Sequence, residues 1–136
     1  MVEINVVYEG DLHCRLTHGP SGAEIFTDAP KDNHGKGEAF SPTDLVAAAI
    51  GSCMLTVMGI FAKRHQINLA GTRLRVQKEM IQEPARRIGQ LKIEIQFPKT
   101  IPEECRRTLE NTAMTCPVHK SLHPDVKIPV TFEYVL

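Results

Sequence analysis

The chain has 136 residues, and its 16 basic side chains balance its 16 acidic ones, so its formal net charge at pH 7 is zero. A chain of this length can bury a substantial core, and we expect one domain over residues 1–136. Because the charges balance, no overall field attracts polyanions, and we expect neither nucleic acid nor an anionic membrane as a partner.

The cysteines and the first residues indicate a reducing compartment. The start, MVEINVVYEG, lacks the basic and apolar regions of a secretory signal, which favours a cytoplasmic protein. Four cysteines stand at the irregular positions 14, 53, 105 and 116. Because the cytosol keeps thiols reduced, we expect any disulfide between them to be transient and chemical.

Residues 2–28 alternate apolar and polar side chains with a period of two, which predicts strands. The turn signal GPSG at 19–22 separates the second run from a third, AEIFTD. We therefore expect a three-stranded antiparallel meander. The apolar face of its second strand comprises Leu12, Cys14 and Leu16. Residues 29–40, rich in Pro, Gly, Asn and Lys, predict an exposed loop.

A helix is expected to begin at residue 41 or 42. Ser41 is a favourable N-cap, Pro42 suits the first helical position, and Asp44 completes a Ser-x-x-Asp capping pattern. The helix should run to about His65.

Residues 45–62 of this helix carry no charge. The run approaches the length of a membrane span, but its glycines, alanines, serine and threonine favour a buried central helix in a soluble protein. A helix that is apolar on every side must be covered on every side. Since one chain of this size could barely enclose it, a helix-to-helix contact in a dimer is expected.

The second half of the chain predicts two more strands, a helix and a last strand. Residues 73–80 and 90–97 alternate as strands. A second capping pattern spans Thr100 to Glu103, followed by an apolar stripe at a spacing of four, formed by Ile101, Cys105, Leu109 and Ala113. A short helical turn should follow from Pro117 to Leu122, and a strand from Val126 to Tyr134. The order β-β-β-α-β-β-α-β predicts the α+β class.

The four cysteines differ in their expected surroundings. Cys14 and Cys105 lie on apolar faces, and we interpret both as small core residues. Cys116 precedes Pro117, which places it at a helix start, where backbone N–H groups favour a thiolate. Cys53 lies in mid-helix, so as a nucleophile it would need a cation or hydrogen-bond donors from elsewhere.

Metal binding is the alternative interpretation of the C-terminal cysteine. Cys116, His119 and His123 have the spacing C-x2-H-x3-H, to which His13 and Cys14 could add ligands. However, no second closely spaced ligand pair is present, and we assign neither a metal nor another cofactor.

The segments FSPTDLVAAAIGSCMLTVM and TCPVHKSL place two cysteines sixty-three residues apart. Together they resemble the OsmC/Ohr family of thiol peroxidases, and the resemblance extends over essentially the whole chain. It implies an intertwined homodimer whose central helices pack between sheets. It also implies reduction of organic hydroperoxides, in an antioxidant, oxidative-stress role, with Cys53 as the peroxidatic residue and Cys116 as the resolving residue.

In such a cycle Cys53 becomes a sulfenic acid and condenses with Cys116. The resemblance implies a dithiol reductant, such as a dihydrolipoyl group, for the resulting disulfide. It requires no flavin, haem or metal, because the electrons pass only through sulfur.

Two residues of the family's active-site pattern have no exact counterpart in this sequence. The family acid follows the helix-opening proline, whereas here Thr43 stands there and Asp44 comes one position later. Nine residues separate Asp44 from Cys53, about 13.5 Å along a helix axis, so Asp44 could act only on the partner's Cys53. Capping alone would also explain it. Arg15, the only arginine before residue 64, is the candidate for the family's thiolate-stabilising arginine.

These departures leave a second hypothesis open. Without the usual acid and arginine, the chain could be a non-enzymatic OsmC-like dimer that senses redox state or binds a ligand, with little or no peroxidase turnover.

Overall fold

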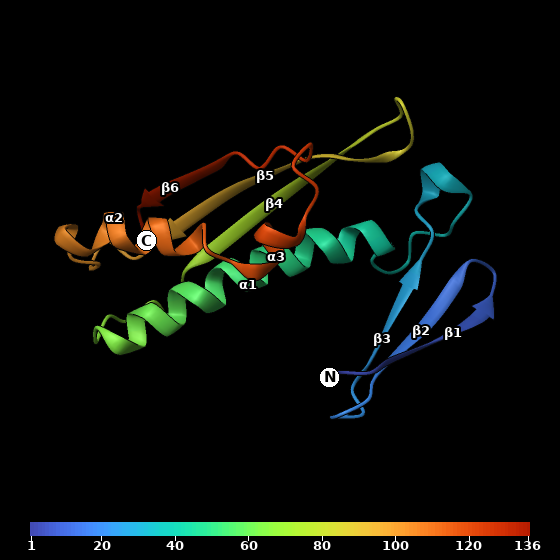
Figure 1. Cartoon of the computed structure of the whole chain (residues 1–136), viewed down its shortest axis with the longest axis horizontal. Coiled ribbons are helices and arrows are strands. Elements are labelled where there is room, and N and C mark those ends of the chain that lie inside the picture. Colours follow the sequence, from blue (N-terminus) through green and yellow to red (C-terminus); the bar gives the residue numbers. More distant parts are fainter. The chain divides into compact units, whose positions relative to one another are not determined.

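The computed structural model describes residues 1–136, which divide into two units, Met1–Val46 and Ala47–Leu136. Each unit contains a three-stranded sheet, with the order β1-β2-β3 in the first and β4-β5-β6 in the second (Figure 1). The predicted order of elements and the α+β class are confirmed.

The first unit is the predicted antiparallel meander. Its strands are β1 (Ile4–Gly10), β2 (His13–His18) and β3 (Glu24–Asp28). The placement of Leu12 on a strand was wrong: Asp11 and Leu12 have φ values of 52° and 60° and form the turn before β2. Apolar alternation cannot reveal such a turn, because Leu12 continues the period of two into β2.

The loop at 29–40 contains one short 3-10 helix, η1 (Lys31–Asn33), whose residues are exposed. Gly35 packs directly against the backbone of Ala29, since a Cβ at Gly35 would lie 1.7 Å from the Ala29 carbonyl oxygen. Only glycine fits this part of the loop.

The helix α1 (Pro42–Arg64) begins as predicted. The Asp44 N–H donates to Ser41 Oγ at 3.1 Å, and the Ser41 N–H donates to Asp44 Oδ2 at 2.9 Å. Both bonds of a capping box are therefore formed, and they satisfy N–H groups that have no partner within the helix.

One face of α1 is buried within its own chain and another is exposed. The buried residues are Ala47, Ile50, Gly51, Met54, Met58 and Ala62. Ala48, Ala49, Ser52, Thr56 and Ile60 are exposed. One chain therefore leaves part of α1 uncovered, and the helix-to-helix contact expected to cover it stays a prediction. By length and composition α1 could cross a membrane, but a core helix of a soluble protein passes the same test.

The second sheet comprises β4 (Arg73–Ile81), β5 (Arg87–Phe97) and β6 (Val130–Tyr134). β4 pairs with β5 antiparallel, and β6 pairs with β5 parallel. The prediction that the last strand begins at Val126 was wrong, because only an isolated bridge between Lys127 and Gln90 precedes Val130. β5 begins three residues earlier than predicted.

Two short helices complete the second unit, α2 (Glu103–Ala113) and α3 (Pro117–Ser121). The capping role predicted from Thr100 was wrong: Pro102 is the N-cap, and no side chain bonds the helix start. The apolar stripe of α2 is confirmed at Leu109 and Ala113, which have no exposed surface.

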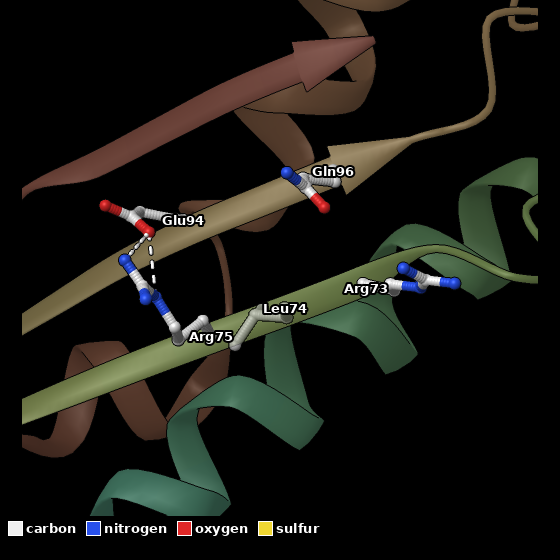
Figure 2. A pocket seen from close by; sticks show the side chains of 5 residues that line it. All are labelled: Arg73, Leu74, Arg75, Glu94 and Gln96. Atoms are coloured by element: carbon white, nitrogen blue, oxygen red, sulfur yellow. Dashed lines mark hydrogen bonds and ion pairs between the residues drawn. The ribbon is translucent and has the colours of Figure 1, made fainter. Parts of the chain in front are cut away.

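The core of the second unit lies where the helices meet one face of the sheet. β5 contributes Leu91, Ile93, Ile95 and Phe97, all with no exposed surface. Side chains of α1, α2 and the α3 start join them in one cluster. The alternate residues of β4 and β5 form the polar face of the sheet, as Figure 2 shows for Arg75 and Glu94.

Candidate active site

Cys53 and Cys116, far apart in sequence, meet in the second unit. Cys53 lies on the flank of α1, half-buried against the core, while Cys116 lies within the core with no exposed surface. Cys53 packs against the core cluster that contains Cys116 and is close enough to raise the pKa of the Cys116 thiol. Both are free thiols. The fold thus joins the two cysteines that the sequence analysis singled out.

Cys116 is positioned by the turn between α2 and α3. Its N–H donates to the Ala113 carbonyl at 3.3 Å, and Thr115 Oγ1 donates to the Thr112 carbonyl at 2.7 Å. Pro117 then opens α3, and Cys116 Sγ accepts from the His119 N–H at 3.5 Å. The predicted place of Cys116 at a helix start is confirmed.

Backbone N–H groups act on Cys116 in the predicted direction, but burial outweighs them. Burial, followed by the hydrogen bond with Cys53, raises the pKa of the Cys116 thiol, although the backbone N–H groups of His119 and Val118 lower it. Desolvation opposes the charged form more than two weak N–H contacts favour it. Cys116 is therefore held as a thiol rather than a thiolate at neutral pH.

Asp44 and Arg15 belong to the first unit and have partners there. Asp44 accepts the Ser41 N–H in the capping box. Arg15 Nε donates to Glu9 Oε2 at 3.3 Å, and its Nη1 lies 3.6 Å from Glu24 Oε1. Their roles at a thiol stay predictions.

The other cysteines and the metal hypothesis add nothing to this site. Cys14 and Cys105 are free and half-buried rather than fully buried. Cys116, His119 and His123 are not gathered with one another, or with another ligand, in any group of three that could hold a metal ion.

Sequence reasoning missed a cavity of about 390 Å³ on the polar face of the second sheet. Figure 2 shows its lining residues, which are Arg73, Leu74, Arg75, Glu94 and Gln96. Arg75 binds Glu94 Oε2 through Nη2 at 2.6 Å and Nε at 2.9 Å. Hydrogen bonding to Arg75 lowers the pKa of Glu94. The alternating polar residues of β4 and β5 were the sequence signal that could have predicted this cavity. No cysteine lines it.

The fold and the paired thiols define a small α+β protein with a two-cysteine site. The family model for OsmC-like proteins matches residues 35–131, and the chain belongs to this family. The resemblance predicted from the two cysteine segments is thereby confirmed.

Solved structures agree over nearly the whole chain. A Psychrobacter arcticus 273-4 protein, provisionally named for osmotic stress induced and detoxification responses, is 47% identical with a TM-score of 0.92; the match covers 98% of this chain and 96% of that one. An OsmC like protein from Mycoplasma pneumoniae is 17% identical, with a TM-score of 0.83 and coverage of 100% and 98%.

The organic hydroperoxide resistance protein OsmC from Legionella pneumophila is 13% identical, with a TM-score of 0.77 and coverage of 98% and 96%. At such identities, this structure and that from Mycoplasma show likeness of fold alone. No curated protein sequence matches the chain.

Proposed function

We propose that this protein is a thiol-dependent peroxidase that reduces organic hydroperoxides through Cys53 and Cys116. The proximity of these two thiols, with Cys53 packed against the core cluster that contains Cys116, is the observation that carries the proposal. Membership of the OsmC-like family supports a general redox or stress role. The names of the Psychrobacter and Legionella proteins, for detoxification and hydroperoxide resistance, agree with it.

The difference in exposure supports the proposed order, in which Cys53 reacts first and Cys116 resolves. A peroxide can reach the half-buried Cys53, whereas Cys116 has no exposed surface. The Cys53 thiolate attacks the distal peroxide oxygen, the O–O bond breaks, and the alcohol leaves with a proton. The Cys116 sulfur then attacks the Cys53 sulfenic acid, releasing water and forming a disulfide. A dithiol supplies two electrons to restore both thiols.

The surroundings of Cys53 favour an organic substrate. One helical turn on either side of Cys53 lie Ala49 and Val57, and α1 carries no charge from 45 to 62. Burying a hydrocarbon substituent against such a surface removes it from water, which lowers the free energy of binding. Hydrogen peroxide has no such substituent and gains nothing from this surface.

We propose a homodimer as the working form. The exposed face of α1 includes Ile60, which is 50% exposed, and the first sheet exposes Ile4, Val6 and Tyr8. Exposed large apolar side chains on each of the two units are suited to burial in an interface. In such a dimer Asp44 and Arg15 are proposed to act on the partner's Cys53, because Asp44 lies about 13.5 Å along the helix axis from Cys53 of its own chain.

The test compares reduction of cumene hydroperoxide and hydrogen peroxide by the purified protein with dithiothreitol. We expect faster consumption of cumene hydroperoxide, its loss in Cys53→Ser, and its retention in the control Cys105→Ser. Mass spectrometry after one equivalent of cumene hydroperoxide should map a loss of two hydrogens to Cys53 and Cys116. Equal rates for wild type and Cys53→Ser would refute the proposal.

A non-enzymatic sensor or binding protein of the same fold is the second candidate. The pairing of Arg15 with Glu9 and Glu24 favours it, because both carboxylates compete with a thiolate for the guanidinium. In that case peroxide still forms the disulfide, but turnover with dithiothreitol is negligible.

A further inference from the structure

We propose that the reductant opens the disulfide only at the sulfur of Cys53 and that Cys116 is the leaving group. This inference rests on the proposed function, because the disulfide is the one formed in that cycle. It specifies where the reductant docks and which thiol is released first.

Accessibility supports attack on Cys53. A thiolate displaces one sulfur of a disulfide along the S–S axis, so it must approach the attacked sulfur from the far side. For Cys116 that approach crosses the core, where Leu109 and Ala113 also have no exposed surface. Cys53 instead lies on the flank of α1 and is only half-buried, so its sulfur is the more open of the two.

Two backbone hydrogen bonds assist the departure of Cys116 and partly offset the burial that raises its pKa. The backbone N–H groups of Val118 and His119 bond its sulfur, the latter at 3.5 Å, and would stabilise negative charge as the S–S bond breaks. Cys53 lies in mid-helix, where backbone N–H groups bond carbonyls of the preceding turn and are not free to bond a sulfur.

Electrons and protons balance in this sequence. A reductant thiolate forms a bond to Cys53 Sγ, the Cys53–Cys116 bond breaks, and Cys116 leaves as a thiolate that takes up the proton released by the reductant. Burial, which raises the pKa of Cys116, favours this protonation and slows the reverse attack. The second thiol of a dithiol then displaces Cys53, which completes the two-electron reduction.

The reductant therefore meets α1 rather than α3. Because α1 carries no charge from 45 to 62, the reductant that fits is a dithiol with no charged group next to its reacting thiol. A monothiol would remain on Cys53 until the neighbouring Cys116 expelled it again.

The test maps a trapped mixed disulfide. The wild-type protein is oxidised with diamide, which forms the disulfide without peroxide, and a loss of two hydrogens is confirmed by intact mass. It is then treated briefly with 2-mercaptoethanol, quenched with acid, blocked with N-ethylmaleimide and mapped by peptide mass spectrometry. We expect the mercaptoethanol adduct on Cys53 and the maleimide on Cys116, with a preference of at least about tenfold.

An adduct on Cys116, equal labelling of both cysteines, or no disulfide after diamide would overturn the inference. The same experiment in urea is the control, because the preference should vanish when the core no longer shields Cys116. A preference that persists in urea also contradicts a structural cause. Since diamide replaces peroxide, a protein without peroxidase turnover can still pass this test, and an active peroxidase can still fail it.

Discussion

The capping box at the start of α1 permits a quantitative prediction. Ser41→Ala removes the acceptor of the Asp44 N–H, and Asp44→Ala removes the acceptor of the Ser41 N–H. Each change should cost about 1 kcal/mol, the usual loss when an N-cap partner is replaced by alanine. Both bonds belong to one capping box, so the two losses should not add in full, and the double variant should lose about 1–2 kcal/mol.

These losses translate into measurable shifts in melting temperature. At about 2.1 cal/mol/K per residue, a chain of 136 residues unfolds with an entropy of about 0.3 kcal/mol/K. Each single variant should therefore melt about 3 °C lower, and the double variant about 3–7 °C lower, by circular dichroism.

Asp44→Asn is the matched control, because it keeps an oxygen that can accept the Ser41 N–H but removes the charge. It should lose less than half of the stability lost in Asp44→Ala. Unchanged melting temperatures in both alanine variants would refute the capping argument. A fall in hydroperoxide turnover in Asp44→Asn at wild-type stability would assign the charge a separate role at the thiol site.

Two further predictions concern the second unit. Burial, then the hydrogen bond that Tyr134 donates to Glu110 at 2.9 Å, raises the pKa of the Tyr134 phenol. The stability that the protonated Tyr134 phenol contributes is fully present below the pKa of tyrosine in the unfolded chain, about 10. It is lost as the pH rises toward the higher pKa that Tyr134 has in the folded protein. Urea unfolding at pH 9–11 should show a steeper loss for wild type than for Tyr134→Phe, and parallel curves would contradict this. Leu109→Ala, at a site with no exposed surface, should cost about 2–5 kcal/mol by the same method, whereas a loss below about 1 kcal/mol would contradict the assigned core position.

Local signals predicted much of the fold. The capping box located the start of α1, and Pro117 located the start of α3 after Cys116. Both depend on contacts within four residues, so the sequence carries them almost in full. Where a local pattern competes with a backbone turn, it fails: Leu12 continues the strand alternation but has a positive φ, and Thr100 fits a cap but Pro102 takes the position.

The residues of the candidate site were predicted from the sequence, but the net direction of the pKa shift of Cys116 was not. The sequence singled out Cys53 and Cys116, and the fold places Cys53 against the core cluster that contains Cys116. It could not show that Cys116 is fully buried, because burial depends on the packing of α2 and β5 around it. For that reason the helix-start argument gave the wrong direction for its pKa.

The sequence by itself therefore determined which elements form, in what order, and which two thiols pair. Helix caps, turns and periodicity act over a few residues, and the two cysteine motifs are short. Only the tertiary structure decided that Cys53 is the accessible sulfur and Cys116 the enclosed one. Solvent access and desolvation are set by chains of contacts between segments up to sixty-three residues apart, and no local pattern records them.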